Sequence, residues 1–382
     1  MNDEASRSDA EPKSTRSTAL GYHAPMPGTD ALGTTLVTGG AGFIGSAVVR
    51  ELLARVSGPV LVLDALTYAG SLDNLPDDPR VELVAGDIAD AELVRSLFER
   101  TRPARVLHLA AESHVDRSID GPMAFVRTNV LGTAVLLEAA REHWSGLDDP
   151  ARAGFRFVHV STDEVFGSLG DEGHFDEHTP YDPRSPYSAS KAGSDHLARA
   201  WHHTYGLPVV VTNCSNNYGP RQHPEKLIPH VTLRALAGDS LPVYGRGANV
   251  RDWLHVEDHA RGLVDAAMVG EAGATYLFGG GAERRNLEVV RAICRALDER
   301  RPQEAPHERL IEFVADRPGH DHRYAIDARS SREGLGWKPA RSFETGLGET
   351  VDWYLTNQAW SARRIERAGL ARRGAGAAAV TP

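Results

Sequence analysis

Short apolar runs alternate with longer amphipathic segments between residues 34 and 213. Six runs consist mainly of apolar residues: TTLVTG (34–39), PVLVLD (59–64), VELVAGD (81–87), RVLHLAA (105–111), FRFVHVS (155–161) and LPVVVTN (207–213). Near-continuous Val and Leu is typical of strands that are buried on both faces. Because helix-like stretches separate these strands, the pattern predicts an α/β fold with a doubly wound parallel sheet.

The strict alternation is lost after Asn213, where Pro, Gly, His and Trp become more frequent, as in VYGRGANVRDWLHVEDH (243–259). We therefore predict one domain over residues 33–213 and a smaller mixed domain mainly over 214–358. Helical patterns near 257–269, 286–300 and 343–358 fit either domain, so the two domains are expected to interleave. Residues 1–32 and 359–382 lack apolar periodicity and are expected to form a disordered N-terminal tail and a C-terminal tail.

Composition excludes several classes of function. The 382 residues carry a net charge of -10 with a pI near 5.9, which argues against nucleic acid as a partner. Cys214 and Cys294 alone provide neither a disulfide framework nor a metal cluster, so we expect no metal ion. No apolar run approaches the length of a membrane span, and the first residues are polar rather than signal-like. These features predict a cytoplasmic protein that does not bind membranes.

The first apolar run ends in a glycine cluster that opens a helix-like segment, TTLVTGGAGFIG (34–45). Gly39, Gly42 and Gly45 follow the spacing GxxGxxG, and counting from Gly40 gives GxGxxG. Between a strand and a helix, such glycines let the backbone approach a pyrophosphate at the positive N-terminus of the helix. A glycine-rich turn alone is common, so a second feature is needed.

That second feature is Asp64, which ends the next apolar run roughly 20 residues further along. A carboxylate at this position binds the ribose hydroxyls of a dinucleotide and repels a 2′-phosphate. The glycines and Asp64 together predict a Rossmann-type domain whose cofactor is NAD rather than NADP.

Two acidic residues follow the fifth run, in STDEVFG (161–167). The carboxyl ends of parallel strands face the ligand crevice, so Thr162, Asp163 and Glu164 are expected where chemistry occurs. A capped turn would use the same residue types. Beside a cofactor, however, desolvation and mutual repulsion raise the pKa of at least one carboxyl, which provides one acid and one base.

A tyrosine and a lysine follow in SPYSASK (185–191). Pro186 suits the start of a helix, which places Tyr187 and Lys191 at i and i+4 on one helical face. The ammonium of Lys191 is expected to favour the phenolate, so that Tyr187 acts as a base near neutral pH. YxxxK alone is common on amphipathic helices, and its combination with the glycine cluster is what makes it specific.

Together, GGAGFIG (39–45), the acid at position 64, GDI (86–88) and YxxxK resemble the extended short-chain dehydrogenase/reductase family of nucleotide-sugar enzymes. Longer strings resemble its dTDP-glucose 4,6-dehydratase branch: DALTYAG (64–70), AAESHVDRSI (110–119), STDEVFG (161–167), NNYGPRQHPEKLIP (216–229), RDWLHVEDH (251–259) and DRPGHDHRYAID (316–327). The resemblance covers residues 33 to 358.

The resemblance implies functional contacts at matching positions. Besides the three glycines, the residues implied to contact NAD are Phe43, Ile44, Asp64, Ala65, Leu66, Thr67, Asp87, Ile88, Leu109, Ala110, Ala111, Thr128, Tyr187, Lys191 and Asn217. Those implied to bind dTDP-glucose are Ser113, Thr162, Asn216, Lys226, Leu227, Pro242, Tyr244 and Arg251, with Asp316, Arg317, Pro318, Gly319 and His320 closing over the nucleotide. A diphosphate ester needs cationic partners, which supports Lys226 and Arg251 independently, although Arg251 could instead pair with a neighbouring acid.

The implied reaction is the conversion of dTDP-glucose to dTDP-4-keto-6-deoxyglucose and water, by an NAD-dependent lyase. Tyr187 takes the 4-hydroxyl proton while hydride leaves C4 for NAD, and Thr162 orients that hydroxyl. Glu164 then takes the C5 proton, Asp163 protonates the departing 6-hydroxyl, and the hydride returns to C6.

Two other functions of the protein stay open. A nucleotide-sugar 4-epimerase or decarboxylase of the same family has no use for the acidic pair, and a noncatalytic nucleotide-sugar sensor would not require Tyr187 and Lys191 as well.

The resemblance also implies a homodimer that pairs helices near residues 121–142 and 187–204. This chain departs from the family pattern at Leu277, where an Asn would contact the nucleotide diphosphate, so the preference for dTDP over UDP is open. Arg221 and His223 replace aromatic residues of the family.

Overall fold

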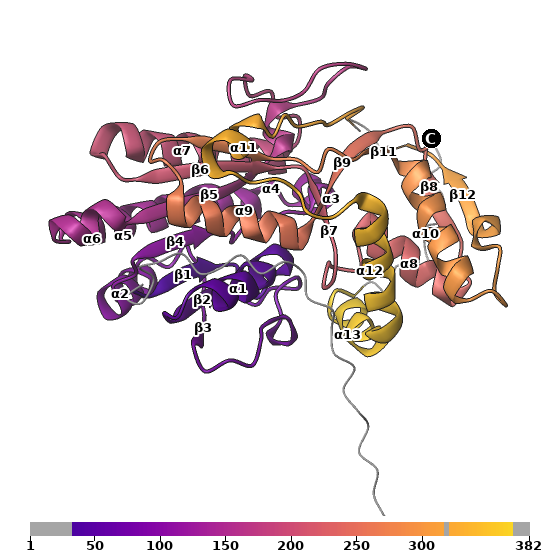
Figure 1. The fold of residues 1–382 in the computed structure, drawn as a ribbon, viewed down its shortest axis with the longest axis horizontal. Coiled ribbons are helices and arrows are strands. Elements are labelled where there is room, and N and C mark those ends of the chain that lie inside the picture. Colours follow the sequence, from indigo (N-terminus) through magenta and orange to yellow (C-terminus); the bar gives the residue numbers. More distant parts are fainter. Residues whose placement is uncertain (1–32, 317–320, 370–382) are drawn as a thin grey trace, which may run out of the picture.

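The computed structural model describes residues 33–316 and 321–369. The predicted N-terminal tail, residues 370–382 and the site candidates Arg317, Pro318, Gly319 and His320 lie outside these ranges. Seven parallel strands form the main sheet in the order β10-β6-β5-β4-β1-β2-β3 (Figure 1). They are β1 (Thr35–Thr38), β2 (Val60–Asp64), β3 (Val81–Ala85), β4 (Arg105–His108), β5 (Arg156–Thr162), β6 (Val209–Cys214) and β10 (Thr275–Phe278). The predicted doubly wound parallel sheet is confirmed, and each of the six apolar runs forms one of its strands.

Helices cover both faces of this sheet (Figure 1). On one face lie α1 (Phe43–Arg55), α9 (Val256–Val269) and α11 (Arg329–Leu335), and on the other lie α2 (Ala91–Thr101), α5 (Thr133–Ser145) and α7 (Pro186–Tyr205). Successive side chains of a strand point to opposite faces. Val37 therefore belongs to the core that includes α1 and α9, whereas its neighbour Leu36 belongs to the core that includes α2 and α5. Both side chains are buried, which explains the unbroken apolar run.

The second part of the chain builds a smaller unit with its own core. Its strands are β7 (Asn216–Tyr218), β8 (Leu241–Tyr244), β9 (Val250–His255), β11 (Glu283–Arg285) and β12 (Ile311–Val314), and its helices are α8 (Leu227–Ala237), α10 (Asn286–Arg300), η4 (His307–Leu310) and α12 (Phe343–Thr356). The sheet β11-β9-β7 mixes parallel and antiparallel pairs, and β12 pairs with β8 in parallel. β10 and α9 pack with the main sheet although they follow Asn213 in the sequence. The division of the chain into two domains at Asn213, which was inferred from the sequence, stays a prediction.

Short elements connect these layers: η1 (Leu72–Asn74), α3 (Val115–Asp120), α4 (Pro122–Phe125), η2 (Val126–Gly132), α6 (Asp149–Gly154), η3 (Asp163–Phe166) and α13 (Gln358–Arg367). The helix α13 occupies part of the segment expected to be a C-terminal tail. Trp360 and Arg364 are both buried and lie four residues apart, on one helical face. Trp360 donates to Asn74 at 3.0 Å and Arg364 to Asp73 at 3.2 Å, so α13 is held against the loop that follows β2.

The segments α4, η2 and α5 form one continuous helix over Pro122–Ser145. The helix has 24 residues, and its most apolar 18-residue window has a mean hydropathy of 1.3, so it is long and apolar enough to cross a membrane by length and composition. The expectation that no apolar run approaches this length was therefore wrong. The protein itself buries 44% of the most apolar window, and α5 packs against α2 and α7. These contacts account for its apolar residues as part of the core.

Candidate active site

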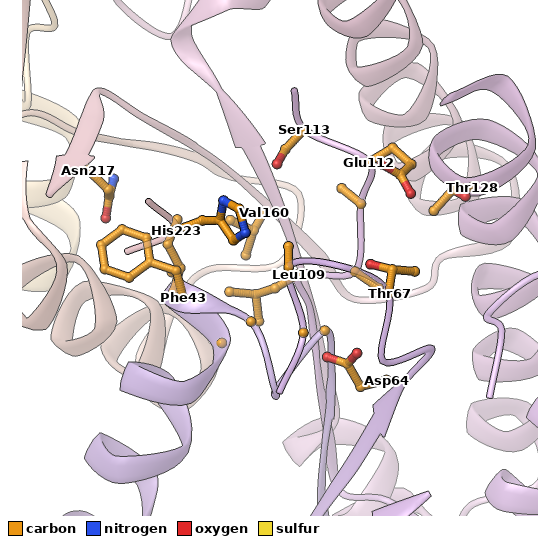
Figure 2. Close-up of a pocket in the computed structure, with 18 of the residues that line it drawn as sticks. Phe43, Asp64, Thr67, Leu109, Glu112, Ser113, Thr128, Val160, Asn217 and His223 are labelled. Carbon is orange, nitrogen blue, oxygen red and sulfur yellow. The ribbon is translucent and has the colours of Figure 1, made fainter. Parts of the chain in front are cut away.

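A cavity of about 400 Å³ lies at the carboxyl ends of the parallel strands. Strand β1 is paired with β2 on one side and β4 on the other, so the chain leaves the centre of the sheet in opposite directions. Ligands of open α/β sheets bind at this switch point. Figure 2 shows lining residues that come from both halves of the chain.

Most of the predicted site residues line this cavity. From the cofactor set these are Gly39, Gly42, Phe43, Ile44, Gly45, Asp64, Ala65, Thr67, Asp87, Ile88, Leu109, Ala110, Ala111, Thr128, Tyr187, Lys191 and Asn217. From the catalytic and substrate sets, the lining residues are Thr162, Asp163, Glu164, Ser113, Asn216 and Lys226. Among the described candidates, Leu66, Leu227, Pro242, Tyr244, Arg251 and Asp316 do not line it. Their roles stay predictions.

The glycine-rich turn fits the diphosphate of a dinucleotide. Gly39 has a φ of +71°, and a Cβ at this position would lie 2.7 Å from the backbone nitrogen of Ala110. Gly42 is the N-cap of α1, and no side chain in the described part of the chain caps that helix. The backbone N–H groups of a first helical turn have no partners within the helix. The turn therefore offers N–H donors and the positive end of α1 to an anionic group.

Asp64 joins this turn to the loop after β2. Its carboxylate accepts hydrogen bonds from the backbone nitrogens of Ala41, at 2.9 Å, and Leu66, at 2.8 Å. Burial raises the pKa of Asp64, and the two backbone hydrogen bonds oppose that effect. A carboxylate has further lone pairs for two ribose hydroxyls, so the residues present fit NAD.

Replacing Asp64 by Ala is expected to weaken NAD binding, because charge-assisted hydrogen bonds to the ribose contribute about 1.5 to 3 kcal/mol each. The measurement is the nucleotide released when purified protein is denatured, together with the NAD dissociation constant of the stripped protein. Asp64→Asn is a second variant of the same size, which removes the charge and replaces one acceptor oxygen with an NH2 donor. Unchanged nucleotide content in Asp64→Ala would remove Asp64 from the site.

The acidic pair lies where β5 ends and η3 begins. Thr162 caps η3, accepting the backbone N–H of Glu164 at 3.3 Å and donating to Asp163 Oδ1 at 3.3 Å. Asp163 is only 2% exposed, and its Oδ2 has no hydrogen-bond partner among the described residues. Burial, and then repulsion from Glu164, raise the pKa of Asp163 well above its usual value. The protonated form of Asp163 is therefore favoured.

Tyr187 projects from the first turn of α7, which begins at Pro186 as predicted. Ser185 forms a capping box with Ser188 and fixes this start. Burial, and then the nearby charge of Glu164, raise the pKa of Tyr187, whereas a hydrogen bond with Thr162 lowers it. The ammonium of Lys191 donates to the carbonyl of Val160 at 2.9 Å. In this structure the pKa of Tyr187 is raised above its usual value, and the effect of Lys191 on the phenolate stays a prediction.

Arg251 lies in β9 and is 6% exposed. Its guanidinium donates to the carbonyls of Val250 at 2.7 Å and Asp321 at 3.0 Å, and lies 4.2 Å from the ring centroid of Tyr324. It therefore bonds to backbone carbonyls rather than to a neighbouring carboxylate. Its positive charge still reaches Asp163, where it opposes the rise in pKa.

Leu277 does not face the cavity. It is fully buried in β10, where it pairs with Asn213, and its carbonyl accepts a hydrogen bond from Ser331. The expectation that this leucine removes a polar contact to the nucleotide came from its departure from the family pattern. In the structure its side chain fills the core, so this position gives no reason to expect altered nucleotide preference.

The sequence analysis missed several lining residues: Tyr68, Glu112, Gln222, Glu225, Trp360 and Arg364. Tyr68 and Glu225 lie within strings that carried the resemblance, and the Tyr68 hydroxyl donates to Glu225 at 3.1 Å across 157 residues of sequence. Trp360 and Arg364 had a weak signal, their helical spacing, in a segment assigned to a tail. Nothing in the sequence indicated that this helix returns to the loop that follows β2.

At pH values above 5, Asp163→Asn is expected to raise the melting temperature of the protein. The folded-state pKa of Asp163 lies above its unfolded value, so the unfolded state ionises first and stability falls as pH rises from about 4 towards the folded pKa. Asn has the same shape and does not titrate, so this loss disappears. Thermal unfolding at pH 4.5 and pH 8 measures the difference in melting temperature between the variant and the wild type. Asp171→Asn, on the surface, is the control. A melting-temperature difference from wild type that does not grow with pH would contradict the assignment.

Comparisons with known proteins agree with this geometry. The model of a family described as GDP-mannose 4,6 dehydratase matches residues 36–350. A dTDP-glucose 4,6-dehydratase of Xanthomonas campestris is 57% identical over 88% of this chain and 99% of its own length. One from Escherichia coli K12 is 56% identical over 85% of this chain and 93% of its own length.

Solved structures give the same result. A dTDP-glucose 4,6-dehydratase of Streptomyces venezuelae, crystallised with NAD bound, has a TM-score of 0.79 and 48% identity, covering 87% of this chain and 99% of its own. A UDP-glucose 4-epimerase of Thermotoga maritima has a TM-score of 0.76 but 28% identity, covering 85% of this chain and 99% of its own. Fold likeness therefore extends to epimerases, whereas the higher sequence identity is with the dehydratase.

Proposed function

This chain belongs to the dTDP-glucose 4,6-dehydratase family, and from that membership we propose how its own residues divide the reaction. The enzyme is an NAD-dependent hydro-lyase that converts dTDP-glucose to dTDP-4-keto-6-deoxyglucose and water. The observation that carries the proposal is the carboxyl pair Asp163 and Glu164, which shares one cavity with Tyr187 and the dinucleotide turn. An epimerase has no step that needs such a pair.

When bound, NAD accepts a hydride from C4 of the sugar and returns it to C6, and the positive charge of its oxidised ring favours the Tyr187 phenolate. The chain supplies the proton transfers. Tyr187 removes the proton of the 4-hydroxyl, while Thr162, which shares a hydrogen bond with Tyr187, orients that hydroxyl. Lys191 lies one helical turn further along and lines the same cavity.

The carboxyl pair then removes water from C5 and C6. A ketone at C4 acidifies the C5 proton, which Glu164 takes as general base. Asp163 donates its proton to the departing 6-hydroxyl, which fits a carboxyl that burial keeps protonated. Two adjacent carboxyls with different environments thus act as base and acid.

The direct test is incubation of the purified protein with dTDP-glucose, followed by alkali, which reveals a 4-keto sugar by its absorbance. The expected result is a 4-keto-6-deoxy sugar without added reductant. UDP-glucose in parallel measures nucleotide preference. Formation of dTDP-galactose instead would identify an epimerase, and absence of any product would favour a noncatalytic protein.

We propose a homodimer formed through the helical segment 115–132 and α7. Four apolar side chains of this segment are exposed in the single chain: Ile119 (61%), Met123 (71%), Val126 (43%) and Leu131 (48%). Patches of this kind on a protein surface mark interaction sites. Met123→Glu is expected to convert the dimer to a monomer, measured by light scattering at micromolar concentration. The control is Val269→Glu, an equally exposed apolar position (56%) at the end of α9. A monomeric wild type would contradict the proposal.

We also propose a cytoplasmic location. Cys214 and Cys294 are free and buried, and free thiols persist in a reducing compartment. Cell fractionation with an antibody to the chain tests this, and recovery in the membrane fraction would contradict it.

A further inference from the structure

His223 presents a buried ring nitrogen without a partner to the cofactor cavity. It lies between β7 and α8, is 7% exposed and lines the cavity (Figure 2). Its Nδ1 accepts the backbone N–H of Glu225 at 3.4 Å, whereas Nε2 has no hydrogen-bond partner among the described residues. Burial lowers the pKa of His223 to about 4, so the ring is neutral at pH 7. Nδ1 also lies 3.5 Å from a carboxylate oxygen of Glu225. Because Nδ1 accepts the backbone N–H, we assign the proton of the neutral ring to Nε2, and this N–H has no acceptor among the described residues.

Contacts to both halves of the chain fix the ring. The Tyr68 ring meets it edge-on with centroids 5.3 Å apart, and the Tyr68 hydroxyl donates to Glu225. The Arg117 guanidinium lies 3.6 Å from the centroid of the Tyr68 ring. Tyr68 belongs to the loop that Asp64 begins, so His223 is held next to the part of the cavity that serves the dinucleotide.

Two arginines line the same cavity. Arg221 lines it in a left-handed conformation, with a φ of +69°, and its guanidinium lies 5.6 Å from the centroid of the Trp353 ring. Arg364 also lines it, and its Nε and Nη1 have no partners in the described part of the chain. A buried donor and unpaired guanidinium nitrogens that line one cavity fit a phosphate-type anion.

We propose that His223 is a cofactor-binding residue whose Nε2–H donates to a diphosphate oxygen of the dinucleotide. The inference rests on the proposed function only for the identity of the cofactor. Both NAD and the nucleotide sugar contain a diphosphate, and the contact with Tyr68 favours the dinucleotide. His223 and the first turn of α1 then hold the same diphosphate from separate parts of the chain.

The test compares His223→Phe, which keeps a flat ring against Tyr68 but has no donor, with His223→Gln, which restores an N–H. Isothermal titration of the nucleotide-free, full-length protein uses three probes: ADP-ribose, adenosine and dTDP. Hydrogen bonds to charged groups are worth about tenfold to a hundredfold in affinity. His223→Phe is therefore expected to bind ADP-ribose about tenfold to a hundredfold more weakly, with adenosine and dTDP within about twofold of wild type, and His223→Gln is expected to recover part of the loss.

Other results would overturn the inference. Unchanged ADP-ribose binding by His223→Phe would show that Nε2 makes no contact with the ligand. An equal loss for adenosine would show that the ring only shapes the cavity, and a loss confined to dTDP would assign the donor to the nucleotide sugar. Thermal unfolding without ligand verifies that both variants fold. Because these titrations contain no sugar substrate, failure of the wild type to make a keto sugar would refute the proposed function and leave this result intact.

Discussion

Glu164→Gln is expected to lower the turnover of dTDP-glucose by about a hundredfold to ten-thousandfold, the usual contribution of a positioned base. Gln has the size of Glu but cannot take the C5 proton. Oxidation at C4 remains possible because Tyr187 and Thr162 are unchanged. A 4-keto sugar that still carries its 6-hydroxyl is therefore expected to accumulate, and reduction with borodeuteride followed by mass spectrometry measures it.

Solvent deuterium provides a second readout. In the wild type, Glu164 removes the C5 proton and a solvent-derived proton returns there, so product formed in deuterated water carries deuterium at C5. Glu164→Gln is expected to lose this exchange along with dehydration. The matched control is Glu51→Gln, another partly buried carboxyl, which lies on α1 outside the cavity. Near-normal dehydration with intact C5 exchange in Glu164→Gln would place the base elsewhere.

Tyr187→Phe is expected to reduce turnover by the same order, about a hundredfold to ten-thousandfold, but at the opening step. Without the phenol, no group removes the 4-hydroxyl proton, so the ketone that acidifies C5 does not form. Neither a 4-keto sugar nor deuterium at C5 is expected. The two variants thus separate the steps, because Glu164→Gln loses elimination alone and Tyr187→Phe loses both.

Tyr181→Phe is the control for the loss of a partly buried phenol. The Tyr181 hydroxyl donates to Asp195 at 2.8 Å and is absent from the lining of the cavity. This variant is expected to lose stability and retain most of its turnover. If Tyr187→Phe still exchanged the C5 proton, another group would be the C4 base and the assignment of Tyr187 would be wrong.

Local sequence determined the sheet and the dinucleotide turn. A strand buried on both faces needs an unbroken apolar run, and this requirement is met within a few residues, as in β2 with its VLVLD sequence. The turn at Gly39 requires a left-handed residue at a fixed place between strand and helix. The helix start at Pro186 and Ser185 is equally local. Such features depend on backbone sterics and neighbouring hydrogen bonds, so they can be read along the chain.

The resemblance supplied residues that spacing alone could not place, such as Thr128 and Asn217, which line the cavity from different elements. The resemblance was also misleading where the position of a residue in the sequence was taken for its position in space. Leu277 was compared with a polar contact residue, but the pairing of β10 with β6 turns it into the core. Side-chain direction in a strand follows from strand pairing, which a single sequence does not state.

Tertiary structure alone decided how the pKa values of the site are shifted and which residues of α13 line its cavity. Folding removes Asp163 from water beside Glu164 and so raises its pKa, and burial raises the pKa of Tyr187 as well. These shifts arise from burial and from charges on other elements, which the spacing of residues does not encode. Likewise, α13 returns to the loop after β2 from nearly 290 residues away, so that Trp360 meets Asn74. The sequence therefore determined which chemical groups the site contains, and folding determined their charge and their neighbours.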